Sequence, residues 1–143
     1  MMNIVFSEIA ILSKLVERAN ERGIDLGNFH FHAVHSALST HEQREAHELE
    51  LFGILHLDEL TSEEDTFWLY CNQTSSLTMN ELMAIRYAIQ KGFVLLTNNS
   101  VLANMAKKLG ASVLDVNDIK EQTQHWKLFK TQHIQLGRVA ALL

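Results

Sequence analysis

Histidines are the first residues in this 143-residue chain that could do chemistry, because imidazole nitrogens bind metal ions and transfer protons. The chain has eight of them, and five fall within one stretch: His30, His32, His35, His41 and His47. The pair His41-Glu42 does not begin an H-E-x-x-H motif, and the spacing of the five matches no standard zinc pattern. We therefore expect these side chains to pack, or to cap helices, rather than to bind zinc.

The sequence shows no motif for cysteine, phosphate-loop or serine-nucleophile chemistry. Cys71 is the single cysteine and lies in the apolar stretch FWLYC, which predicts a buried core residue. The six glycines are scattered and mostly follow expected helices, so no glycine-rich phosphate loop is present. No Ser/His/Asp arrangement can be inferred from the order of residues alone.

Apolar runs and helical periodicities alternate along the chain. Strands are expected near residues 3–6, 29–34, 54–60, 93–97 and 112–116, with helices between them and a last helix from 118 onward. Ser39 with Glu42, and Thr78 with Glu81, form two capping boxes that open helices. Strands that alternate with helices need crossover connections. The sequence therefore predicts an α/β fold, a three-layer α-β-α sandwich with a mostly parallel central sheet of about five strands.

Polar residues follow the expected strands. In sheets of this kind the ligand site lies at the carboxyl ends of the strands. That rule selects Ser7, Glu8, His35, Ser36, Asn98, Asn99 and Asp115. Glu81, at the start of a helix, could join them. We expect the functional site among these residues.

Two segments resemble a known family. Residues 77–116, LTMNELMAIRYAIQKGFVLLTNNSVLANMAKKLGASVLDV, are similar to the C-terminal half of PIN domains. That half has an acidic residue opening an alanine-rich helix, an apolar strand, a Thr-x-Asp turn, and a helix that ends in Leu-Gly. The N-terminal VFSEIAIL resembles the family's first strand, which ends in an acidic residue. By order of elements the resemblance covers residues 3–116.

The resemblance implies a PIN-like, Mg²⁺- or Mn²⁺-dependent endoribonuclease, a candidate toxin of a toxin–antitoxin pair. It places Glu8 at the first acidic position, Glu81 at the helical one and Asn99 where the family has an aspartate. These three would be the catalytic residues and, with Asp115 as an auxiliary, the metal ligands. Hard divalent cations take oxygen ligands, and a metal-bound water can serve as the nucleophile. RNA and an antitoxin or other protein are the implied partners, and a homodimer is the implied assembly.

The chain departs from the family at its acidic positions. Asn99 brings no negative charge. The family has an acid soon after the second strand, but here that place falls near Ala37 and no acid is evident. Two charges would remain where the family has three or four, and metal affinity falls with ligand charge. Each residue also has a purely structural interpretation: Glu81 as part of a capping box, Asn99 as a helix cap, and Glu8 as a first-turn residue. The alternative function is a catalytically inactive PIN-like protein that acts as a binding or regulatory module through its C-terminal helix.

Charge is distributed unevenly along the chain. Residues 119–143 carry Lys120, Lys127, Lys130 and Arg138 against Glu121, a net of +3, which leaves −8 on the rest of a chain of net −5. An acidic body argues against broad electrostatic binding of nucleic acid. We expect a PIN-like domain over 1–118 and a helical extension over 119–143. Trp126 and Phe129 lie on the apolar face of this extension, which suits either a binding surface or packing on the sheet. A single cysteine, no membrane span and no signal peptide favour a cytoplasmic protein.

Overall fold

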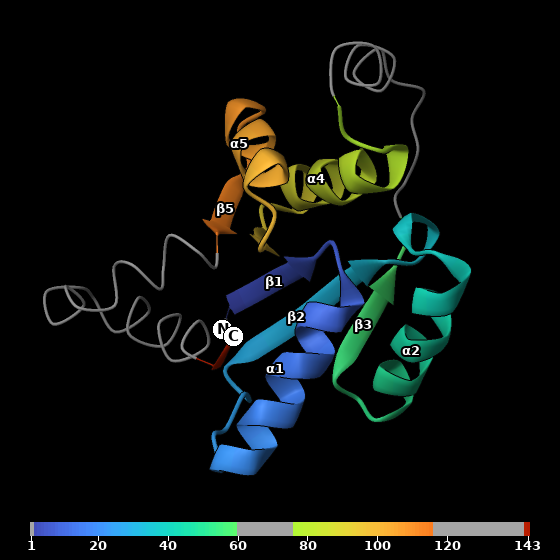
Figure 1. Ribbon diagram of the computed structural model, residues 1–143, viewed down its shortest axis with the longest axis vertical. Coiled ribbons are helices and arrows are strands. Elements are labelled where there is room, and N and C mark those ends of the chain that lie inside the picture. Colours follow the sequence, from blue (N-terminus) through green and yellow to red (C-terminus); the bar gives the residue numbers. More distant parts are fainter. Residues whose placement is uncertain (1, 60–75, 116–141) are drawn as a thin grey trace, which may run out of the picture.

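The computed structural model describes residues 2–59, 76–115 and 142–143 (Figure 1). Its strands are β1 (Met2–Phe6), β2 (Phe29–Val34), β3 (Leu55–Asp58), β4 (Val94–Thr97) and β5 (Ser112–Asp115). Its helices are α1 (Ile9–Arg22), the 3₁₀ turn η1 (His35–Ala37), α2 (Thr40–Leu51), α4 (Met79–Lys91) and α5 (Ser100–Lys108). The expected helix near Ser62, the residue Cys71 and the bulk of the 119–143 extension lie outside the described residues.

The five strands form one sheet in the order β3-β2-β1-β4-β5, and every pair is parallel. The predicted α/β architecture is therefore confirmed, with a sheet that is wholly rather than mostly parallel. β1 lies in the centre, where Ile4 pairs with Phe31 of β2 on one side and Val94 of β4 on the other. The chain order reverses between β1 and β4, so ligands of such a sheet bind near the carboxyl ends of these two strands.

Alternation along the strands divides the core into two layers. Ile4 and Phe6 of β1 pack with α1 and α2, whereas Val5 packs with α4 and α5. Figure 1 shows these two helix pairs on opposite sides of the sheet. In β2 the FHFHAV pattern works the same way: Phe31 is buried in the layer of α1 and α2, and His32 packs against Phe93 in the layer of α4 and α5. Burial on both faces explains why the strands are rich in apolar residues.

Helix ends follow the sequence signals. The capping boxes of Ser39 with Glu42 and of Thr78 with Glu81 are both formed, so these two predictions are confirmed. Gly23 and Gly92 close α1 and α4 at φ of 65° and 68°, a left-handed conformation that glycine adopts without the steric cost of a Cβ.

The last two residues pack against the first helix. Leu142 is fully buried in the layer formed with α1 and α2. Nη1 of Arg18 lies 2.5 Å from the backbone oxygen of Leu142 and 3.2 Å from that of Leu143, and donates to both. These contacts fix residues 142–143 on α1, which agrees with packing of the chain end on its own domain. In the described ranges, no helix combines the length and apolar character that crossing a membrane requires.

Candidate functional site

Three strands present polar side chains to α4. Oδ2 of Asp58, at the end of β3, accepts a hydrogen bond from the hydroxyl of Tyr87 in α4. The same oxygen lies 2.8 Å from Nδ1 of His32 in β2. Nε2 of His32 lies 2.9 Å from the side-chain oxygen Oδ1 of Asn3 in β1. A hydrogen-bonded network therefore runs from the central strand to the edge strand beneath α4.

Burial sets the protonation of this network. Desolvation lowers the pKa of His32 below its usual 6.5, although the hydrogen bond to Asp58 opposes that change. The lowered pKa favours the neutral ring at pH 7. Both partners are acceptor oxygens and a neutral ring carries a single N–H, so His32 donates to Asp58 or to Asn3 according to its tautomer. Desolvation, and then Asp58, raise the pKa of Tyr87 far above 10.

Both ring nitrogens of His32 are engaged, so the network offers no free imidazole nitrogen for proton transfer. The ring also packs against Phe93, at a centroid distance of 4.7 Å, and against His56 at 5.2 Å. The expectation that the strand histidines pack is met at this position. Sequence reasoning missed Asp58, although the strand-end rule would have selected it once β3 had been bounded.

At the end of β1, Ser7 and Glu8 differ in environment. Glu8 is the N-cap of α1, but its exposed side chain makes no capping bond. The N–H of Ile9 instead donates to Oε2 of Glu42, at 3.4 Å. The hydroxyl oxygen of Ser7 is buried, and no described residue forms a hydrogen bond with it. Strand alternation places Ser7 on the same side of the sheet as Val5, the side of α4 and α5.

The ends of β4 and β5 add two buried polar residues. Thr97 is fully buried, and its hydroxyl accepts from the N–H of Asn99 at 3.1 Å. Asp115, 7% exposed, pairs in register with Thr97. Since Phe6 pairs with Leu96, Ser7 follows β1 at the level where Thr97 ends β4. The strand-end rule therefore brings Ser7, Thr97 and Asp115 to one edge of the sheet.

Glu81 serves the start of its helix. Its Oε1 lies 3.1 Å from the N–H of Thr78 and 2.9 Å from the Thr78 hydroxyl, and accepts from both. The Thr78 hydroxyl in turn accepts from the N–H of Glu81 at 3.2 Å. This reciprocal pair satisfies the first backbone donors of α4. The structural interpretation of Glu81 is therefore realised.

Asn99 is the N-cap of α5. Its Oδ1 accepts from the N–H groups of Val101 and Leu102, at 3.0 and 3.3 Å. The oxygen that a cation would use thus already holds two helix donors. The structural interpretation of Asn99 is realised as well.

The donor set fits a hard divalent cation poorly. Glu8 is exposed and Asp115 is buried. Oε1 of Glu81 and Oδ1 of Asn99 accept the hydrogen bonds that cap their helices. Over residues 2–59, 76–115 and 142–143, no three His, Cys, Asp or Glu side chains are grouped so that they could hold a metal ion. Nuclease centres of the implied type need several converging carboxylates.

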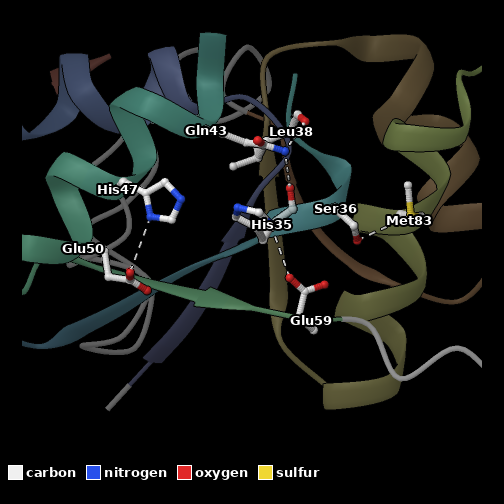
Figure 2. Close-up of polar contacts among 8 residues, drawn as sticks. All are labelled: His35, Ser36, Leu38, Gln43, His47, Glu50, Glu59 and Met83. Carbon is white, nitrogen blue, oxygen red and sulfur yellow. Dashed lines mark hydrogen bonds and ion pairs between the residues drawn. The ribbon is translucent and has the colours of Figure 1, made fainter. Parts of the chain in front are cut away.

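The position where the family's second acid was expected holds the turn η1. Ala37 is buried there, and His35 and Ser36 precede it. Figure 2 shows that His35 lies beside Glu59 and faces His47 of α2. No sequence signal joined His35 to His47, because twelve positions separate them and the turn between them was not foreseen.

A cavity of about 350 Å³ lies at the opposite end of the sheet. Its lining comes from the end of α1, the loop before β2 and the turn before β3, and includes Val16, Ile24, Phe29 and Ile54. These segments precede the strands, so this cavity is separate from the strand-end residues.

No protein-family model and no curated protein sequence matches this chain. One solved structure is similar: a domain of a functionally unknown protein from Methanocaldococcus jannaschii DSM 2661. The two share 14% identity and a TM-score of 0.53, over 80% of this chain and 91% of that one. At this identity the likeness shows a shared fold alone.

Proposed function

We propose that this chain is a PIN-like protein without metal-dependent nuclease chemistry, and that it acts as a binding or regulatory module. The PIN-like assignment is supported by the segments 5–12 and 77–116 quoted above. The parallel sheet formed by the described strands agrees with the fold that the resemblance implies. The single Cys71 favours a reducing compartment, and we propose the cytoplasm as its location.

One observation carries the non-catalytic interpretation. Glu81 and Asn99, two of the three residues that match the family's acidic positions, each use a side-chain oxygen to cap a helix. A metal ligand at either position would compete with those hydrogen bonds, and replacing an N-cap side chain costs about 1 kcal/mol. Asn99 also adds no charge to attract the ion.

The binding partner proposed is another protein chain, either a second copy or an antitoxin-like partner. The segment 119–143 carries a net +3 against −8 for the remaining chain, so it complements an acidic surface such as that of a second copy. RNA is the less favoured partner, because the body of the chain is acidic.

The test is RNA cleavage by the full chain with Mn²⁺ or Mg²⁺, beside the variant Glu81→Gln. Glutamine retains the capping box and removes the charge, so this variant should fold like the wild type. We expect no metal-dependent cleavage from either protein. Cleavage that requires Mn²⁺ and disappears in Glu81→Gln and Glu8→Gln would overturn the proposal. Sedimentation of the same samples reports self-association, the first of the proposed partnerships.

A weakened metal-dependent endoribonuclease is the second candidate. It is favoured by the buried hydroxyl of Ser7, which has no hydrogen-bond partner among the described residues and lies at the crossover point of the sheet. Under this candidate Glu8 and Glu81 would hold the metal, with Asp115 as an auxiliary ligand, and cleavage would be slow. Asn99→Asp would then speed Mn²⁺-dependent cleavage, because it restores a charge without removing the cap. No change in cleavage on that substitution would exclude this candidate.

A further inference from the structure

Two histidines from different elements face one another at the end of β2. His35 begins η1, directly after the strand, and His47 lies in α2. Their ring centroids are 5.2 Å apart, and the ring planes make an angle of 57°. Figure 2 shows the two rings pointing toward one another across the space between η1 and α2. The side chains are 34% and 54% exposed, so water reaches the space between them.

Each histidine has a carboxylate beside its Nδ1. Nδ1 of His35 lies 3.3 Å from Oε1 of Glu59, and Nδ1 of His47 lies 3.7 Å from Oε1 of Glu50. A carboxylate at this distance favours the tautomer with the proton on Nδ1, which leaves the Nε2 lone pair free to bind. Metal-bound histidines commonly have this arrangement, in which an outer carboxylate orients the ring and raises its basicity.

The backbone that carries His35 is fixed to the helix that carries His47. Gln43, one turn before His47 in α2, donates its side-chain N–H to the carbonyl oxygens of His35 and Leu38, at 3.4 and 3.2 Å. These bonds hold η1 against α2. Ser36 adds a contact of its hydroxyl with the sulfur of Met83 in α4, at 3.9 Å. The relative position of the two backbone segments that carry the rings is therefore set by the fold before any ligand arrives.

We propose that Nε2 of His35 and Nε2 of His47 bind one first-row divalent transition-metal ion, such as Zn²⁺, with water as the remaining ligands. A tetrahedral ion with Zn–N bonds of ~2.0–2.1 Å places two bound imidazole centres about 5 Å apart, which agrees with the observed separation. Imidazole suits Zn²⁺, Ni²⁺ and Cu²⁺, whereas Mg²⁺ takes oxygen ligands. Two protein ligands make this an exchangeable site, and it is independent of the function proposed above.

The experiment is calorimetric titration of Zn²⁺ into the full chain at pH 7.5, with circular dichroism to confirm folding. The wild type should bind one ion. His47→Gln, at an exposed position in the middle of α2, should weaken that binding about 100-fold or more, and Glu50→Gln should weaken it by a smaller factor, about tenfold, at the lower end of the range for outer carboxylates. The matched control is His41→Gln, an exposed histidine of the same helix, which should bind as the wild type does.

The proposal would be overturned by a Zn²⁺ affinity that is unchanged in His47→Gln, or by one that falls equally in His41→Gln. His35→Gln tests the second ligand. If that variant does not fold, the Nε2 resonances of the wild type decide, because only the imidazoles of His35 and His47 should shift on adding Zn²⁺. A parallel titration with Mg²⁺ should give no uptake at this pair. Mg²⁺ uptake that His47→Gln abolishes would contradict the assignment of ligands.

Discussion

The hydroxyl of Tyr87 in α4 donates a hydrogen bond to Asp58, at the end of the edge strand β3. β3 has four residues, and among the described strands it pairs with β2 alone. A bond from α4 therefore gives this short strand a second attachment. Because the same carboxylate oxygen also meets His32, one acceptor connects a helix, an inner strand and an edge strand.

Tyr87→Phe should destabilise the protein by roughly 1 kcal/mol. The variant keeps the buried ring and removes the donor to a carboxylate that is about a third exposed, which places the loss near the ordinary net value of a hydrogen bond. Urea unfolding at pH 7.5 measures it. Asp58→Asn combined with Tyr87→Phe should cost less than the sum of the two single changes, since both remove the same bond. A midpoint identical to that of the wild type would contradict this assignment.

Alkaline pH should reveal the same bond in another way. The folded-state pKa of Tyr87 is raised above 10, so the folded protein holds the phenol proton more tightly than the unfolded chain does. This contribution to stability is complete below pH 10 and is lost as the pH rises above 10. Between pH 9 and 11 the wild type should therefore lose more stability than Tyr87→Phe. Parallel curves for the two proteins would show that Tyr87 titrates normally.

Acid should weaken the fold through His32. Burial lowers its folded-state pKa, so the unfolded chain binds a proton more readily. The contribution is complete above pH 6.5 and is lost as the pH falls from 6.5 toward the lowered value. Urea unfolding from pH 8 to pH 5 should show a steeper loss in the wild type than in His32→Gln. The control is His41→Gln, which replaces an exposed histidine, and its stability should change with pH as that of the wild type does.

Changes at Asn99 should separate a cap from a ligand. Asn99→Ala should cost about 1 kcal/mol, because the N–H groups of Val101 and Leu102 lose their acceptor. Asn99→Asp should stay close to the wild type, since aspartate caps equally well and its charge suits the helix N-terminus. Thermal unfolding of the three proteins checks this order. Equal stability of Asn99→Ala and the wild type would remove the capping role.

Leu142→Ala should destabilise the protein by about 2–4 kcal/mol, because the side chain is fully buried against α1 and its removal leaves a cavity. Leu51→Ala is the matched control. Leu51 is 86% exposed at the end of α2, so its loss should change the urea midpoint little. If both variants unfold at the wild-type midpoint, the last residues do not contribute to the core.

Local signals in the sequence predicted local structure. The FHFHAV pattern located β2 and its two faces, and Thr78 with Glu81 located the start of α4, because strand alternation and helix capping depend on residues close in sequence. The prediction of a parallel sheet followed from alternating elements. The order of its strands did not, since pairing depends on contacts between distant segments.

Side-chain partners across elements were beyond the sequence for the same reason. Nothing near Asp58 indicates that Tyr87 and His32 both bind it, and nothing near His35 indicates His47. The metal ligands implied by resemblance stay a prediction for Glu8, Glu81, Asn99 and Asp115. The helix-capping roles that the sequence also suggested for Glu81 and Asn99 are the ones their side chains perform in the structure.

The position of β1 between β2 and β4 has a consequence for synthesis of the chain. Ile4 pairs with Phe31, which the ribosome makes early, and with Val94, which it makes much later. Throughout that interval the backbone of β1 has an unpaired side that can join a strand of another nascent chain. Parallel pairing over such a separation is slow, so the yield of folded protein should depend on how quickly β4 arrives and on chaperones that cover β1 until then.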